Sequence, residues 1–250
     1  MTIKIIINGA SGKMGVTAVK AIAAEPDLTL VAAIGKKDNL ENEIKKHRAD
    51  VVIDLTTPHA VFENAKIIIE SGARPVIGTS GLTPDQIEQL KLLCEKKSLG
   101  GIIAPNFSIG AILMMQFSNI AAKYFSDVEI IEAHHPYKLD APSGTALKTA
   151  ELIASHKLQK NSSADVDLKL NNNGARGKHH HNIPIHSVRL SGVFAKQEVI
   201  FSSPSEILTI EHNALDRHSM MPGLFLCCRR VMELHYLLYG MEKLIENENS

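Results

Sequence analysis

The densest group of residues able to do acid–base chemistry is the stretch EAHHPYKLDAPSGTA, residues 132–146. His134, His135 and Lys138 follow an apolar run, and Ser143 stands where it can cap a helix. Histidine exchanges protons near neutral pH, and lysine supplies a positive charge or a proton. The first N–H groups of the helix can bind an anion. This set of groups is better suited to binding a small, multiply charged acid than to binding a metal ion.

A second candidate site is the glycine-rich segment GASGKMG, residues 9–15, between an apolar strand-like run and a helical pattern. Because glycine lacks a Cβ, the backbone there can approach a pyrophosphate closely, and the helix N-terminus adds a partial positive charge. The spacing is GxxGxxG and not the commoner GxGxxG, so a turn that binds no ligand is the alternative. The position at the first strand–helix junction favours dinucleotide binding.

The second predicted strand ends in IGKKD, residues 34–38. Dinucleotide sites usually place an Asp or Glu there to bind the adenosine ribose. Here Lys36 and Lys37 stand where a 2′-phosphate would lie, so we predict a preference for NADPH over NADH, through Lys36 with Lys37 as the second candidate. A solvated pair of lysines, with Asp38 reaching the ribose, is the alternative.

The elements that must position these residues alternate between strand and helix over the first hundred residues. Short β-branched runs predict strands at residues 3–8, 28–34, 51–55, 75–78 and 101–104. Helical spacing predicts helices at residues 13–24, 39–47, 59–71 and 84–97. The alternation indicates right-handed βαβ units, and hence a Rossmann-like, doubly wound parallel sheet.

The pattern changes near Pro105. Helices are predicted at residues 109–124 and 143–156, strands at 128–134, 185–190, 198–201 and 206–211, a polar loop at 161–181, and a helix at 215–239. The last three strands are closely spaced, which favours an antiparallel meander. We predict an α/β fold with a dinucleotide-binding domain, residues 1–105 plus 216–250, and a smaller α+β domain with a mixed or antiparallel sheet for substrate binding and oligomerisation, residues 106–215.

Composition excludes several classes of partner. The 27 Lys and Arg residues balance the 27 Asp and Glu residues, and aromatic residues make up 4% of the chain. A protein that binds nucleic acid or an anionic membrane needs a surplus of positive charge on one face. We therefore expect neither kind of partner.

The three cysteines are informative about the cellular location of the protein, and a run of three histidines raises the question of metal binding. Cys94, Cys227 and Cys228 form neither a disulfide framework nor a ligand spacing typical of metal sites, and no secretory or membrane segment is recognisable, so we expect a cytoplasmic protein. Three adjacent histidines, residues 179–181, cannot all face one ion from a regular element, and a solvated loop is the better interpretation. We expect no metal site.

The motifs together resemble the dihydrodipicolinate reductase (4-hydroxy-tetrahydrodipicolinate reductase) family. The resemblance covers GASGKMG, IGTSG at residues 77–81, APNFSIG at 104–110, EAHHPYKLDAPSGTA, VRLSG at 188–192 and HNALDR at 212–217. It implies NAD(P)H-dependent reduction of 4-hydroxy-tetrahydrodipicolinate to tetrahydrodipicolinate in the diaminopimelate route to lysine, in a homotetramer. The chain departs from the family pattern in three ways. The acidic residue at the end of the second strand is absent, and Lys36 stands where the family usually has an Arg that binds the 2′-phosphate. The segment between the second and third strands is also short.

The resemblance also implies roles for individual residues. His134 would be a proton donor and acceptor, and Lys138 a proton donor. The carboxylates of the dicarboxylate substrate would be bound by His135, Ser143, Gly144 and Thr145. The cofactor would be bound by Lys36 and by Gly9, Ala10, Ser11, Gly12, Lys13, Met14, Gly78, Thr79, Ser80, Ala104, Pro105, Asn106 and Phe107.

Two other classes of protein stay open on the residues alone. One is a different oxidoreductase, such as an amino-acid or semialdehyde dehydrogenase, and the other is a regulator that binds NAD(P) without turnover. Neither needs the donors of residues 132–146. A hydrolase is disfavoured because Ser80 and Ser108 have no matching His/Asp arrangement. His212 and Arg217 either support the site or only pack.

Overall fold

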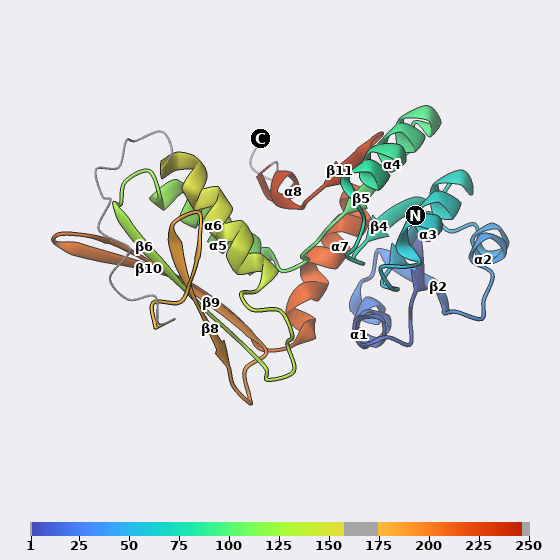
Figure 1. The fold of residues 1–250 in the computed structure, drawn as a ribbon. Helices are drawn as coiled ribbons and strands as arrows, with labels where there is room; N and C mark the ends of the chain where they lie inside the picture. Colours follow the sequence, from blue (N-terminus) through green and yellow to red (C-terminus); the bar gives the residue numbers. More distant parts are fainter. Residues whose placement is uncertain (1, 158–174, 247–250) are drawn as a thin grey trace. The chain divides into compact units, whose positions relative to one another are not determined.

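A computed structural model describes residues 2–157 and 175–246 of the chain. The chain divides into two compact units. The first comprises Met1–Ile109 and Arg217–Ser250, and the second comprises Gly110–Asp216. Each unit is built around one sheet (Figure 1).

The first unit contains a six-stranded sheet in the order β11-β5-β4-β3-β1-β2, with every described pair parallel. The strands are β1 (Ile3–Asn8), β2 (Leu28–Ile34), β3 (Val51–Asp54), β4 (Arg74–Ile77), β5 (Gly101–Ile103) and β11 (Leu237–Tyr239). The helices are α1 (Lys13–Ala21), α2 (Leu40–His47), α3 (Val61–Glu70), α4 (Pro84–Lys97), α7 (Met221–Arg230) and α8 (Glu242–Glu246), with short 3-10 turns η1 (Ile22–Ala24) and η2 (Arg217–Met220). The predicted Rossmann-like sheet is confirmed.

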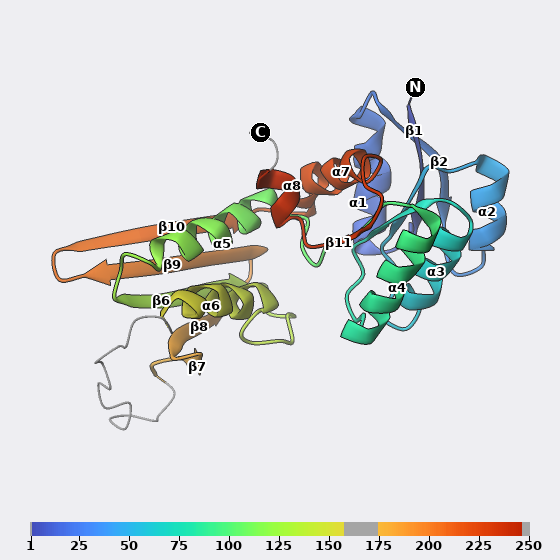
Figure 2. The same cartoon turned by 90° about the horizontal axis from the view of Figure 1, so that it is seen from above.

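Helices cover both faces of this sheet, which is why its strands are apolar on both sides. Helices α2, α3 and α4 share one buried cluster with the sheet, whereas α1 and α7 lie on the opposite side (Figure 2). In β1, Ile5, Ile6 and Ile7 are all completely buried. Such uninterrupted β-branched runs are typical of parallel strands between two helical layers.

The C-terminal segment differs from its prediction. Residues 215–239 were expected to form one helix, but α7 ends at Arg230 and β11 pairs with β5. A Cβ on Gly100 would lie 2.5 Å from the Leu234 carbonyl oxygen, and one on Gly101 would lie 2.5 Å from Leu237 Cδ1. The two glycines therefore let this segment approach β5 closely, and a free sheet edge outweighs the local helical pattern.

The second unit contains a five-stranded mixed sheet in the order β10-β9-β6-β8-β7. Its strands are β6 (Asp127–His134), β7 (Lys178–His180), β8 (Ile183–Arg189), β9 (Ala195–Ser203) and β10 (Glu206–Ala214). Helices α5 (Ile109–Ala121) and α6 (Gly144–Lys157) both lie on one face of the sheet (Figures 1 and 2). Gln197 of β9 donates to Thr149 of α6, a buried hydrogen bond of 2.7 Å between that face and the helix.

The predicted antiparallel meander is wrong in part. Strands β9 and β10 form the expected antiparallel pair, but β6 lies between β8 and β9, parallel to the former and antiparallel to the latter. Local spacing could not reveal this, because β6 comes from a segment about fifty residues earlier in the chain. Most of the predicted loop at 161–181 lies outside the described residues, and residues 178–180 of it form β7. Within the described ranges, no helix combines the length and apolarity that a membrane span requires.

Candidate active site

Two adjacent strands of the second unit position the central polar group. Side chains two residues apart on a strand share a face, so Glu132 and His134 lie side by side on β6. Strand β8 runs parallel to β6 in a register that pairs Ser187 with Glu132 and Arg189 with His134. Four polar side chains are thereby brought to one face at the end of the sheet.

The Glu132 carboxylate is completely buried and fully paired. Arg189 donates to both of its oxygens, from Nη1 and Nη2, at 3.0 Å each. Burial by itself raises the pKa of a carboxyl group, but hydrogen bonds from His134, Arg189 and Ser187 and the Arg189 charge outweigh it and lower the pKa of Glu132 to about 2. Glu132 is thus an anion at neutral pH, in a bidentate pair that defines its orientation.

This carboxylate determines which nitrogen of His134 carries a proton. The Nδ1 atom of His134 lies 2.6 Å from Glu132 Oε2. Because an ionised carboxylate only accepts hydrogen bonds, Nδ1 must be the donor. The Nε2 atom is left as the nitrogen that can exchange a proton with a ligand.

Lys138 belongs to the same network through Asp140. Its Nζ donates to Asp140 Oδ1 at 2.8 Å, and this hydrogen bond is the main reason why the pKa of Asp140 lies below its ordinary value. Arg189 Nη2 donates to the Asp140 carbonyl oxygen at 2.7 Å. One guanidinium therefore fixes both the partner of the histidine and the loop that presents the lysine.

The start of α6 offers the predicted anion-binding group. The Ser143 hydroxyl accepts a hydrogen bond from the Ala146 N–H at 3.2 Å, the predicted N-cap. Gly144 and Thr145 form the first turn, where backbone N–H groups precede any intrahelical acceptor. His135 Nδ1 is buried and has no hydrogen-bond partner among the described residues. A ligand carboxylate would satisfy such groups.

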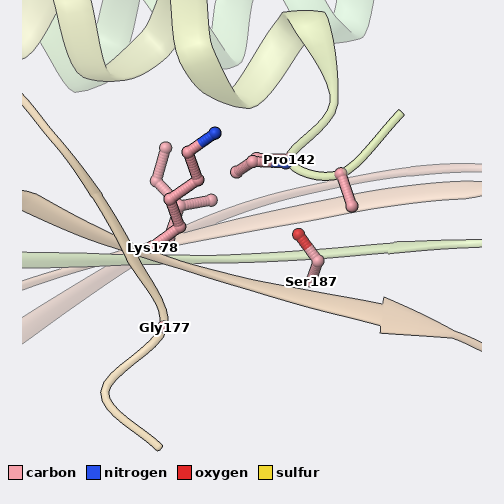
Figure 3. A pocket seen from close by; sticks show the side chains of 6 residues that line it. Pro142, Gly177, Lys178 and Ser187 are labelled. Atoms are coloured by element: carbon pink, nitrogen blue, oxygen red, sulfur yellow. The ribbon is translucent and has the colours of Figure 1, made fainter. Parts of the chain in front are cut away.

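An open hollow adjoins the network on the β8 side. It is lined by Ala141, Pro142, Gly177, Lys178, Ile185 and Ser187. Figure 3 shows Pro142, Lys178 and Ser187 around it. The lining contains none of the expected substrate residues, although Pro142 directly precedes Ser143, so the hollow does not by itself define the site.

In the first unit, the glycine-rich segment forms the turn between β1 and α1. Gly9 has φ +89°, and a Cβ there would lie 2.6 Å from the Leu55 carbonyl oxygen. A Cβ on Gly15 would lie 2.2 Å from the Gly9 carbonyl oxygen. Larger residues cannot occupy these positions without moving the backbone. Gly12 caps α1 and leaves the segment from Ser11 to Lys13 exposed, while Ala10 and Met14 are half-buried.

A buried carboxyl group connects the neighbouring loops of this unit. Asp54, at the end of β3, is completely buried and accepts hydrogen bonds from Asn8 at 3.1 Å, Asn64 at 2.8 Å and Thr79 at 2.8 Å. The Thr56 hydroxyl donates to it at 2.7 Å. The ends of β1, β3 and β4 are thus tied to one acceptor, which fixes the predicted cofactor residue Thr79.

The other predicted cofactor residues divide between exposed and buried. Gly78 packs on the Phe107 ring, to which a Cβ would come within 2.4 Å. Ala104 and Phe107 have buried side chains, so only their backbone is available to a ligand, whereas Ser80 and Pro105 are exposed. The Asn106 side chain accepts from the Ser108 N–H at 2.8 Å and shapes the turn. All of these residues follow β4 or β5, at the carboxyl edge of the sheet where ligands bind open α/β folds.

At the end of β2, Lys36 and Lys37 are both exposed. The Asp38 carboxylate accepts a hydrogen bond from the Gly35 N–H at 2.8 Å. The Asp38 carboxylate therefore already stabilises this turn, while the two lysine side chains extend into solvent.

Sequence reasoning assigned no role to two of the central residues, Glu132 and Arg189. The signal for Glu132 was its position two residues before His134 on a strand, which places both on one face. Arg189 lies in the motif VRLSG, but only the parallel pairing of β6 and β8 brings it to Glu132.

Comparison with known proteins identifies relatives over almost the whole chain. Residues 3–107 match the family described as "Dihydrodipicolinate reductase, N-terminus", and residues 110–245 match "Dihydrodipicolinate reductase, C-terminus". The 4-hydroxy-tetrahydrodipicolinate reductase of Coxiella burnetii (strain Dugway 5J108-111) is 54% identical over 245 residues, covering 98% of this chain and 100% of that protein. The enzyme of the same name from Legionella pneumophila (strain Corby) is 52% identical over 246 residues, with the same coverage.

A solved structure shares the whole fold. The dipicolinate-bound dihydrodipicolinate reductase from Paenisporosarcina sp. TG-14 superimposes with a TM-score of 0.89 at 42% identity, covering 97% of this chain and 99% of that one. The two family models, the relatives that match along almost their whole length, and this solved structure all point to the same family. The chain belongs to the dihydrodipicolinate reductase family.

Proposed function

We propose that this chain reduces 4-hydroxy-tetrahydrodipicolinate to tetrahydrodipicolinate in the diaminopimelate route to lysine, with His134 and Lys138 as its proton-transfer residues. Membership of the family makes it an NAD(P)H-dependent oxidoreductase. The observation that carries the residue assignment is the His134 imidazole against the buried Glu132 carboxylate, with Lys138 on the loop that the same arginine binds.

The proposed conversion is the loss of the 4-hydroxyl group as water, which leaves a conjugated imine in the ring, followed by addition of a hydride and a proton. The reduced nicotinamide supplies the hydride when bound. The ring-nitrogen region of the substrate must then be protonated, and a positioned acid accelerates such a step by about 10² to 10⁴. His134 Nε2 is the nitrogen free to exchange a proton, and Lys138 Nζ supplies a proton or stabilises negative charge. Glu132 and Arg189 position these two groups and do not themselves touch the reacting atoms.

The substrate carboxylates are assigned to His135, Ser143, Gly144 and Thr145. The support is the α6 N-terminus, whose N–H groups and partial positive charge favour an anion, together with the buried, unpartnered Nδ1 of His135. The Paenisporosarcina relative is described as dipicolinate-bound, and dipicolinate is a dicarboxylate of similar shape.

The cofactor is assigned to the first unit. Gly9, Ala10, Ser11, Gly12, Lys13 and Met14 would bind the pyrophosphate, and Gly78, Thr79, Ser80, Ala104, Pro105, Asn106 and Phe107 would line the nicotinamide side. The support is the exposed turn at the α1 N-terminus and the position of the other two loops at the carboxyl edge of the sheet. The domain roles follow: residues 1–105 plus 216–250 bind dinucleotide, and residues 106–215 bind substrate.

The preferred cofactor is NADPH. A 2′-phosphate is a dianion that lysine binds as a point charge. Lys36 and Lys37 are exposed at the end of β2, and the Asp38 carboxylate that could bind a ribose hydroxyl is engaged by Gly35.

A homotetramer is the proposed assembly. The second unit exposes large apolar side chains on α5 and on β10, the last strand in the order of its sheet: Phe117, Ile120, Ile207 and Leu208. Ile207 is 73% exposed. Large apolar side chains left exposed are typical of association surfaces. A cytoplasmic location is proposed because Cys94, Cys227 and Cys228 are free, buried thiols whose pKa values burial raises.

The activity is tested by following NADPH oxidation with freshly prepared condensation product of pyruvate and aspartate semialdehyde. The wild-type chain is expected to turn over, and Lys138→Ala is expected to lower kcat by about 100-fold or more because a proton donor is lost. Titration of nicotinamide fluorescence should show unchanged NADPH binding by this variant.

The matched control is Lys148→Ala, which removes an exposed lysine paired with Glu151 on α6. It should keep wild-type kcat. Absence of turnover by correctly folded wild-type chain would refute the reductase function, whereas normal turnover by Lys138→Ala would refute only the role of Lys138.

Cofactor preference is tested by kcat/KM for NADPH and NADH. Wild-type chain is expected to favour NADPH, and Lys36→Ala to lose about tenfold in kcat/KM for NADPH with little change for NADH, since a charge-assisted hydrogen bond is lost. Lys45→Ala, an exposed lysine on α2, serves as the control. A wild-type preference for NADH contradicts the proposal.

The Glu132 network predicts a pH-dependent stability. The pKa of Glu132 is about 2 in the folded chain and 4.5 in its ordinary state, so its stabilisation is complete above pH 4.5 and is lost as the pH falls toward 2. Glu132→Gln should therefore be less stable than wild type by about 3 kcal/mol at neutral pH, with the gap closing in acid.

Denaturant unfolding from pH 7 to pH 3 measures this gap, with Glu129→Gln, a half-exposed neighbour, as the control. The Glu132→Gln variant should also shift the pH profile of kcat, because His134 loses its orienting partner, and the control should not. A stability gap that stays constant with pH argues against an ionised Glu132.

The assembly is tested by light scattering. Wild-type chain should have the mass of a tetramer, and Ile207→Glu should give a smaller species, because a charge on an apolar contact surface opposes association. The control Lys196→Gln removes a charge on the neighbouring strand without removing an apolar contact or adding a like charge beside Glu198 and Glu211, and should leave the mass unchanged. A monomeric wild-type chain contradicts the proposal.

A further inference from the structure

Three side chains of metal-ligand type gather beside the turn between β7 and β8. They are Glu151 on α6, His180 at the end of β7, and His181 in the turn, and one ligand atom from each lies within 4.8 Å of the others. We propose that these three residues bind a divalent transition-metal ion, with Zn²⁺ as the ion of choice.

The turn explains how adjacent histidines can share an ion. Neighbouring side chains on a strand point to opposite faces, and on that ground the sequence disfavoured a metal site. Strand β7, however, ends at His180, and His181 and Asn182 both have left-handed backbone conformations, with φ of 51° and 64°. A two-residue turn of this kind reverses the chain at once. The rings of His180 and His181 consequently lie 4.5 Å apart between centroids.

The distances suit a shared ion better than a direct contact. His180 Nε2 lies 3.6 Å from Glu151 Oε1, too far for a good hydrogen bond. Two ligand atoms at 2.0–2.1 Å from a tetrahedral zinc ion lie about 3.4 Å apart. His180 Nε2 is also buried and without a hydrogen-bond partner among the described residues. Lys148 pairs with the other oxygen of Glu151, Oε2, at 3.3 Å, so that Oε1 stays available.

The ligand types select the ion. Two imidazoles and one carboxylate match the nitrogen and oxygen preferences of zinc, and the exposure of His181 and Glu151 leaves a fourth position for water. Glu151 lies seven residues after Gly144, about 10 Å along α6 from the proposed substrate end of the helix. The ion would therefore crosslink α6 to the β7–β8 turn without occupying the reduction site.

The test uses full-length chain without a polyhistidine tag, stripped of metal by a chelator and then dialysed. Zn²⁺ titrated by calorimetry should bind with a stoichiometry of one per chain and should raise the thermal unfolding midpoint, because an ion that binds only the folded state stabilises it. Co²⁺ in the same site should give the visible absorption of a nitrogen- and oxygen-ligated ion.

Glu151→Gln, His180→Gln and His181→Gln should each weaken Zn²⁺ binding by about tenfold or more and abolish the thermal shift. His179→Gln is the matched control. It removes one histidine of the same run, but this exposed residue pairs opposite Pro184 and does not belong to the cluster. No zinc binding by the wild-type chain, unchanged binding by Glu151→Gln, or an equal loss in His179→Gln would each overturn the proposal.

Discussion

The second unit depends on one buried charge, the carboxylate of Glu132. Removing a carboxylate from water is costly unless hydrogen bonds and an opposite charge replace the solvent. Arg189 does so with two hydrogen bonds, and it can reach Glu132 only because β8 runs parallel to β6 in one register. The same arginine also binds the loop that carries Lys138. The pairing of β6 with β8, the protonation of His134 Nδ1 and the position of Lys138 therefore all depend on the interaction between Arg189 and Glu132.

The first unit contains a comparable buried carboxylate, Asp54, at the carboxyl edge of its sheet. Asp54 is buried and accepts hydrogen bonds from side chains at the end of β1, after β3, after β4 and on α3. An acceptor of this kind fixes loops that would otherwise be free to vary, and loops at this edge bind ligands in open α/β sheets. In both units, a buried acid converts the end of a sheet into a rigid support for residues of the proposed site.

Prediction from sequence succeeded where local pattern and tertiary environment agree. Runs such as residues 5–7 and 51–53 are apolar on both sides because helices cover both faces of the sheet, so the local sequence pattern already reflects the tertiary environment. It failed at residues 237–239, where the free edge of β5 recruits a segment with a helical pattern, and at β8, which pairs with a strand far earlier in the chain. Strand neighbours in a mixed sheet depend on long-range contacts that spacing does not encode.

The sequence by itself determined the family resemblance and the candidate chemical groups, which are the motif with His134 and Lys138 and the glycine-rich turn, because these rest on residue type at close spacing. Only the tertiary structure decided that Glu132 is ionised and directed at His134, that Arg189 unites two parts of the site, and that His180 and His181 converge on Glu151. These features join residues from separate elements. These contacts depend on strand register, turn geometry and burial, and none of these properties can be inferred from the residues adjacent in the sequence.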